Sequence, residues 1–214
     1  MLLQLRSMAN RRLCRTRTRL LDAGFSLMEL MVVLAFVGTL AAIAIPTVTR
    51  ALASIRLNGA VRTIANMTAV TKTRAASKFS RARLYVDRTN NSFHVETWDS
   101  TVVPAQWVVD GGTTFLPVNV TFGFGVVGAP PANTQPAIQL APPCLDNAGA
   151  VVGNTDCIVF NSRGIPIDNA GAPTNVDALY ITDGTTVLGV TVTGTGLIGV
   201  WSTPPVVAPL WTIA

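Results

Sequence analysis

The chain has 214 residues and a formal net charge of +5 at pH 7. Residues 1–24 hold six arginines and one aspartate and so carry this excess, while residues 25–214 hold ten basic and ten acidic residues. The sequence pI of about 9.7 therefore gives no argument for nucleic-acid binding. Without residues 1–24 and the apolar segment that follows, roughly 168 residues remain, which is one domain's worth of chain and enough for a hydrophobic core.

Residues 25–45 form an apolar run that begins Phe25-Ser26-Leu27-Met28-Glu29-Leu30. As a helix, the run is long enough to span about 30 Å of hydrocarbon. Its only charge is Glu29. A carboxylate inside a membrane helix costs about 2.5–3.5 kcal/mol on insertion scales, so we expect Glu29 to have a partner or a task. The arginines before the run favour a cytoplasmic N-terminus.

This arrangement resembles the signal of type IV pilins. Gly24 stands where a prepilin peptidase cleaves, and Phe25 stands where the family has its N-methylated new N-terminus. Glu29 matches the family's near-invariant glutamate, and Pro46 matches its helix-interrupting proline. The resemblance implies that Glu29 pairs with the N-terminal ammonium of a neighbouring subunit in a filament.

Two other interpretations of the run stay open. It could be a secretory signal peptide with Ala42-Ile43-Ala44 as its cleavage site, or a plain membrane anchor in which Glu29 has no role. However, the run exceeds the usual 7–15-residue apolar core of a signal peptide. The stretch before it is also long, and an acidic residue near its start would be unusual. These features favour the pilin interpretation.

Residues 47–80 are expected to continue the helix as an amphipathic stem, because proline can bend a membrane helix without ending it. The arginines at 56, 62 and 74 fall away from one apolar helical stripe. That stripe comprises Leu57, Val61, Ile64, Thr68, Ala75 and Phe79. The spacing predicts a helix to about residue 79 whose apolar side lies on a sheet.

After residue 81 the pattern changes to that of strands. Residues 82–87 and 92–98 alternate and are separated by Asn90-Asn91, which predicts a hairpin. Further strands are predicted at 107–109, 119–124, 157–161, 178–182, 186–192 and 197–201. Asp183-Gly184 and residues 193–196 are predicted turns, and 125–155 a long loop. In the tail, residues 202–214, three prolines argue against a central strand. Trp211 favours docking of the tail on the head or on a partner, and a disordered tail is the alternative.

The cysteines divide between two compartments. Cys14 lies in the leader, whereas Cys144 and Cys157 lie in the part expected outside the cytoplasm. An even pair in an oxidising compartment favours a disulfide, and two buried free thiols are the alternative. Closing a loop of about 14 residues would contribute roughly 3 kcal/mol in the chain-entropy model.

A second stretch, residues 158–166, reads Ile-Val-Phe-Asn-Ser-Arg-Gly-Ile-Pro and resembles the strand and turn of the GspH/FimT family of pseudopilins and minor pilins. The matching family-motif positions are Phe160, Gly164 and Gly196. DNA-binding members carry basic residues in the last glycine turn, but residues 196–199 here contain none. Phosphate contacts need such charge, so we expect no DNA binding, although the arginines at 81, 83 and 88 could form a local patch.

The sequence offers no pattern typical of catalysis. The only histidine, His94, lies on a predicted strand and is interpreted as structural. Zinc spacing, calcium loops, phosphate loops and nucleophile elbows are absent from the sequence, so we expect no enzyme activity, cofactor or metal. Residues 25–88 hold nine basic residues, and residues 89–214 hold eight acidic ones. A basic stem and an acidic head could attract each other between stacked subunits, or the charges could simply be solvated.

Together these features predict an α+β protein: a leader (1–24), a transmembrane helix (25–46), an amphipathic helix (47–80) and a β-rich head (81–214) of two packed antiparallel sheets. The resemblance implies a minor pseudopilin of type II secretion, near the filament tip; the alternative is a FimT-like minor pilin serving adhesion, motility or DNA uptake. The implied partners are a prepilin peptidase, other pilin or pseudopilin subunits, inner-membrane lipid and the assembly platform. The implied location is the bacterial inner membrane, single-pass with a periplasmic head.

Overall fold

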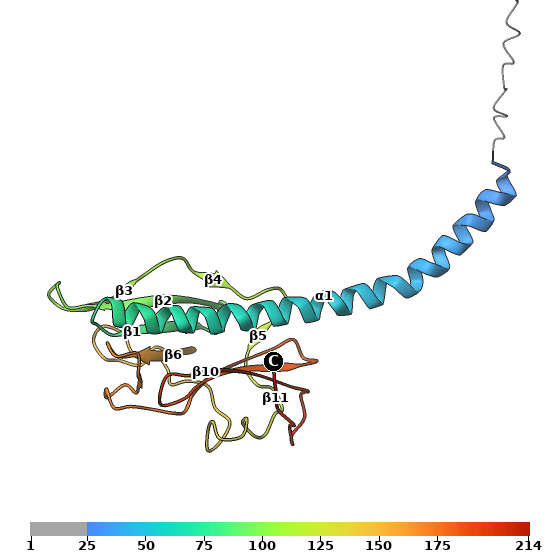
Figure 1. The fold of residues 1–214 in the computed structure, drawn as a ribbon. Helices are drawn as coiled ribbons and strands as arrows, with labels where there is room; N and C mark the ends of the chain where they lie inside the picture. Colours follow the sequence, from blue (N-terminus) through green and yellow to red (C-terminus); the bar gives the residue numbers. More distant parts are fainter. Residues whose placement is uncertain (1–24) are drawn as a thin grey trace, which may run out of the picture. The chain divides into compact units, whose positions relative to one another are not determined.

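A computed structural model describes residues 25–214, which form one long helix followed by two antiparallel sheets (Figure 1). The predicted α+β fold is thus confirmed. The chain divides into two compact units, with the boundary between Pro46 and Thr47. The helix α1 (Leu27–Ser77) continues through Pro46, as the sequence predicted. Gly24 and Cys14 lie outside the described residues.

The end of α1 corrects one prediction. The side chains of Leu57, Val61, Ile64 and Ala75 are buried, but Phe79 is 89% exposed. The helix ends at Ser77, and Phe79 adopts a left-handed conformation with φ of 49°. The Ser80 amide then donates to the carbonyl of Ala75, which is the pairing of a Schellman cap. Because the chain reverses here, the helical stripe cannot extend to Phe79.

The first sheet has six strands and contains the predicted hairpin. Its path is β3 (Gln106–Val109), β2 (Ser92–Asp99), β1 (Ala82–Asp87), β6 (Thr155–Phe160) and β7 (Pro166–Ile167), and β4 (Thr114–Phe115) also pairs with β2. In the antiparallel register Arg83 lies opposite Glu96 on β2 and opposite Val159 on β6. The two-residue strands β4 and β7 were not predicted from the sequence.

The second sheet has five strands. Their order is β11 (Thr212–Ile213), β10 (Ile198–Thr203), β9 (Val187–Val192), β8 (Asp177–Thr182) and β5 (Thr121–Phe122). The prediction of a strand over 119–124 was too long, because Asn119 and Gly123 both have positive φ and stop the extended pairing on either side. The predicted turns after β8 and β9 are present, with Gly184 and Gly196 at φ of 85° and 74°.

One hydrophobic core joins the stem helix to the inward faces of both sheets. From α1 it takes Leu57, Ala60, Val61, Ile64 and Ala75; from the first sheet Ala82, Leu84, Val86, Phe93, Val95, Ile158 and Phe160; from the second Leu179, Ile181, Leu188, Val190 and Val192. Alternate strand residues point to opposite faces, so this inward set leaves Arg83, Tyr85 and Glu96 on the outer face of the first sheet. Most of the predicted helical stripe therefore serves as one wall of the core.

The long loop and the tail cover the outer faces of the sheets. Val127 and Trp211 pack with Tyr180 of β8 against the second sheet, and Cys144 packs with Val159 against the first. The indole Nε1 of Trp211 donates to the carbonyl of Ala129 at 2.9 Å. The tail therefore docks on the head, as an edge strand that follows its prolines.

Candidate assembly site and the glycine turns

The first turn of α1 is organised around Ser26 and Glu29. The Glu29 amide donates to Ser26 Oγ at 3.1 Å, so Ser26 caps the helix. The Ser-x-x-Glu spacing is that of a capping box, and a negative side chain in the first turn is favoured by the helix dipole. The structure thus places the Glu29 carboxylate in the first helical turn, close in sequence to Phe25.

The residues after Phe25 present apolar side chains on the helix surface. Large apolar side chains from Phe25 to Ile45 are between 45% and 78% exposed. An 18-residue window of α1 has a mean hydropathy of 2.3, and none of it is buried. The helix is therefore long and apolar enough to cross a membrane, as expected for a single-pass protein. Of the predicted assembly residues, Glu29 and Pro46 lie on this helix and Phe25 just precedes it.

The two motif glycines, far apart in sequence, meet at one place in the head. Gly164 and Gly196 both have positive φ, 73° and 74°. A Cβ atom added to Gly196 would lie 2.6 Å from the carbonyl oxygen of Gly164, and one added to Gly164 would lie 3.0 Å from the Lys72 side chain. The Lys72 ammonium donates to the Gly196 carbonyl at 2.9 Å. The third motif residue, Phe160, is fully buried in β6.

Lys72 is a residue that the sequence analysis missed. The final glycine turn has no basic residue of its own, yet the structure brings the Lys72 ammonium to it from the stem helix. A signal was available, because Lys72 lies one helical turn after Thr68 beside the buried stripe. The sequence could not indicate which distant carbonyl the ammonium would reach.

The arginines at 81, 83 and 88 do not form the local basic patch that the sequence allowed. Arg83 pairs with Glu96 at 2.5 Å and is almost fully buried. Arg88 lies 3.2 Å from the Asp156 carboxylate. Arg81 lies over the Trp98 ring, 4.7 Å from its centroid. Because two of the three cations are paired within the head, little unpaired positive charge is left for phosphate groups.

The predicted disulfide is present. Cys144 and Cys157 are bonded, with their Cα atoms 5.0 Å apart. Cys157 belongs to β6, so the bond ties the long loop to the outer face of the first sheet. The Cys157 amide also donates to the carbonyl of Pro142 at 2.8 Å, which fixes the same approach.

The ionisable groups of the head form structural contacts. His94 stacks on Tyr85 at 4.9 Å, and its Nε2 lies 3.1 Å from Glu96. Burial disfavours the Glu96 carboxylate, but the hydrogen bond with His94 and the charge of Arg83 outweigh it, so the pKa of Glu96 lies below its ordinary value. Among residues 25–214, no three His, Cys, Asp or Glu side chains gather closely enough to hold a metal ion.

Two buried aspartates have raised pKa values, in contrast to Glu96. Burial raises the pKa of Asp177 to about 7, helped by the charge of Asp168. Burial also raises the pKa of Asp156 to about 6, against the charge of Arg88. Asp177 is 2% exposed, and its Oδ2 has no hydrogen-bond donor within residues 25–214. These carboxyls therefore affect the pH dependence of stability.

Comparisons of the chain with protein-family models, with curated proteins and with solved structures give no match.

Proposed function

We propose that this chain is a minor pseudopilin of the type II secretion system, stored in the inner membrane and then assembled into a pseudopilus that serves protein secretion. The observation that carries the proposal is the start of α1. There, Glu29 is the only charged residue between Phe25 and Thr49, on a helix whose apolar side chains are exposed. Such a helix suits both lipid and the packed interior of a filament.

The energetics of Glu29 support a role in assembly. A single carboxylate in a membrane helix costs about 2.5–3.5 kcal/mol on insertion scales. Removal of residues 1–24 would create an ammonium at Phe25, four residues before Glu29. In a filament, the ammonium of one subunit can pair with Glu29 of the next, and desolvated opposite charges attract strongly. This pairing would offset the cost of Glu29 and favour extraction of the subunit from lipid.

The head supports the proposal through its rigid connection to the stem. The core joins residues 57–75 of α1 to both sheets, and Lys72 ties the stem to the last glycine turn. A filament subunit needs such a connection, because the head must follow the stem when helices pack. Salt bridges from Lys78 and Arg74 to Asp110, at 2.8 and 3.7 Å, add to it. These stem cations therefore act within one subunit.

The first experiment is expression with and without a prepilin peptidase, followed by intact-mass and N-terminal peptide analysis. We expect loss of residues 1–24 and a methylated Phe25 only when the peptidase is active. A Gly24→Leu variant should stay uncut, whereas a matched Ala23→Leu control should still be processed. A mature N-terminus at Ile45, or an intact leader in the presence of the peptidase, would contradict the proposal.

A deletion in the source bacterium separates secretion from pilus formation. We expect accumulation of extracellular enzymes to fall while surface pili stay normal, and the intact gene should restore secretion. Loss of surface pili with unchanged secretion would instead assign the chain to a type IV pilus.

A further inference from the structure

The head carries two copies of the same five-residue turn, Asp-Asn-Ala-Gly-Ala, at residues 146–150 and 168–172. In each copy the aspartate Oδ1 accepts two backbone amides, at 2.9 and 2.8 Å. The aspartate amide of each copy donates to the carbonyl of the last alanine at 2.8 Å, and the two glycines share a φ of 86°. The two turns are therefore matched, locally braced structures. Their repetition was a sequence signal that the analysis of motifs missed.

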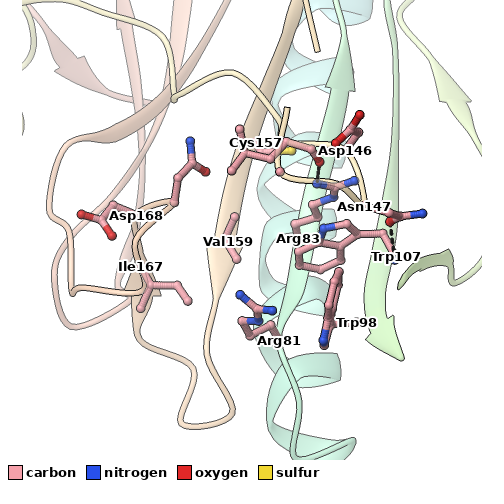
Figure 2. A pocket seen from close by; sticks show the side chains of 13 residues that line it. Arg81, Arg83, Trp98, Trp107, Asp146, Asn147, Cys157, Val159, Ile167 and Asp168 are labelled. Atoms are coloured by element: carbon pink, nitrogen blue, oxygen red, sulfur yellow. Dashed lines mark hydrogen bonds between the residues drawn. The ribbon is translucent and has the colours of Figure 1, made fainter. Parts of the chain in front are cut away.

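A hollow of about 170 Å³ lies on the outer face of the first sheet, and both turns contribute to its lining. Val159 and Ile167 form an apolar part of the lining, next to the disulfide-bonded Cys157. Figure 2 shows Ile167 and Asp168 on one side of Val159, with the arginines and tryptophans on the other. The hollow is therefore apolar in its middle and polar at its sides, as small-molecule sites are.

The wall opposite Asp168 is a fixed stack of aromatic and guanidinium groups. Trp98 and Trp107 meet edge to face at 5.2 Å, and Arg83 lies over Trp107 at 4.1 Å. Arg83 is held by Glu96 and by the carbonyl of Leu145, each at 2.5 Å. The side-chain oxygen of Asn147 accepts a hydrogen bond from the backbone amide of Trp107 at 2.8 Å. These contacts preorganise the wall, which lowers the entropic cost of binding.

The polar groups around the hollow still have bonding capacity. Each Asp-Asn-Ala-Gly-Ala turn uses aspartate Oδ1 and leaves Oδ2 as an acceptor. Within residues 25–214 no carboxylate lies within ion-pair distance of Arg81, and the Asn169 side chain makes no hydrogen bond. Arg81 offers donors only, whereas an asparagine amide offers both donors and an acceptor. A ligand here thus meets donors and acceptors around an apolar floor.

From these features we propose that the hollow binds one ring of a neutral saccharide. A sugar hydroxyl both donates and accepts, so it can use guanidinium, amide and carboxylate groups together. The apolar C–H face of a sugar ring suits the apolar side chains of Val159 and Ile167. The lining carries two guanidinium and two carboxylate groups. An anionic ligand would face Asp146 and Asp168, and a cationic one would face Arg81, since Arg83 is already paired with Glu96.

The size of the hollow limits the ligand to one ring. Pockets for drug-sized ligands measure roughly 300–1,000 Å³, well above the 170 Å³ found here. A ligand of about a dozen heavy atoms gains little binding free energy, so we expect a Kd of about 1–10 mM for a single glycoside. Several subunits or several sugar units would raise the apparent affinity.

The test uses the full chain in a detergent without a sugar head group and follows saturation-transfer NMR of methyl glycosides. Methyl glucoside, galactoside, mannoside and N-acetylglucosaminide are titrated to about tenfold above the expected Kd, with glucuronate and glucosamine as charged counterparts. We expect saturation transfer to at least one neutral glycoside and weaker transfer to both charged sugars. Absence of transfer to every neutral glycoside, or a preference for a charged sugar, would overturn the proposal.

Variants locate the binding. Arg81→Gln replaces the guanidinium with a shorter amide, and Asn169→Ala removes an amide. Each should lose one hydrogen bond to the ligand and weaken binding about fivefold. Arg163→Gln changes an exposed arginine that does not line the hollow and should leave binding unchanged. Near-ultraviolet circular dichroism checks that each variant keeps its fold. Equal binding by all variants would place the saccharide elsewhere and refute the site.

Discussion

Lys72 donates a hydrogen bond from its ammonium to the backbone carbonyl of Gly196 at 2.9 Å, although 124 residues separate them. The same lysine side chain lies against Gly164, so one stem residue contacts both glycine turns. A charge-assisted bond of this kind, partly shielded from water, contributes more than a neutral one. Both turns favour glycine because both positions have a positive φ, and at Gly196 an added Cβ would also lie 2.6 Å from the Gly164 carbonyl oxygen.

Gly196→Ala should destabilise the head by more than the usual cost of a left-handed alanine, which is about 1–2 kcal/mol. The added Cβ would lie 2.6 Å from the Gly164 carbonyl oxygen, so the turn must shift as well. Gly184→Ala is the matched control, because Gly184 has φ of 85° and open space around it. Thermal unfolding in detergent, followed by near-ultraviolet circular dichroism of the head tryptophans, measures both. Equal losses would show that the close approach has no energetic role.

Phe79→Gly should stabilise the head by about 1 kcal/mol, because glycine adopts the left-handed cap without strain. The phenylalanine ring is 89% exposed, so its removal loses little buried surface. Phe79→Ala removes the ring but keeps the Cβ and should give no such gain. The same thermal unfolding experiment measures the stability of both variants. A stabilisation of equal size in both variants would point to the exposed ring instead of the backbone.

Asp177→Asn should stabilise the head at neutral pH and change little in acid. The pKa of Asp177 is about 7 in the folded chain against 3.8 for a free aspartate. The folded state therefore holds its proton to higher pH, and stability falls as pH rises from about 4 to about 7, by up to about 4 kcal/mol. The variant removes this pH-dependent loss of stability. The raised pKa of Asp156 leaves a smaller loss of stability in the same direction. A gain that is equal at about pH 4 and about pH 8 would contradict the assignment.

Replacing Cys144 and Cys157 by serine together should cost about 2–4 kcal/mol, the usual effect of losing a native disulfide that closes a short loop. The long loop would also be released from the outer face of the first sheet. Alkylation of the wild-type chain under denaturing, non-reducing conditions should label neither cysteine. Labelling of both cysteines in protein isolated from the source cells would mean that the bond does not form there.

Glu29→Ala follows from the proposed function. Membrane insertion should be unchanged or better, because a carboxylate leaves the apolar helix. Incorporation into filaments should fall, because the ammonium of the neighbouring subunit loses its partner. Thr39→Ala, on the same exposed helix, is the control and should assemble normally. Wild-type assembly of the Glu29 variant, measured in sheared filament fractions, would remove Glu29 from the mechanism.

The sequence determined the features that depend on local composition and period. The exposed apolar part of α1 follows from the apolar run after Phe25, because only length and hydropathy make a helix able to cross a membrane. The hairpin of β1 and β2 follows from alternation on both sides of Asn90-Asn91, and the predicted two-sheet fold follows from further strands of this kind. The disulfide could be predicted because only two cysteines lie in the part expected outside the cytoplasm. These predictions hold because each rests on composition, periodicity or the number of cysteines, all of which can be read directly from the sequence.

Only the tertiary structure decided which distant groups meet. The strands β4, β7 and β11 have two residues each, too few to show a period, and exist because a neighbouring strand offers free hydrogen-bonding groups. Lys72 reaches Gly196, and the two Asp-Asn-Ala-Gly-Ala turns flank one hollow, because the core fixes α1 and the sheets together. Such contacts depend on the packing of whole elements, and no local pattern encodes the identity of the partner.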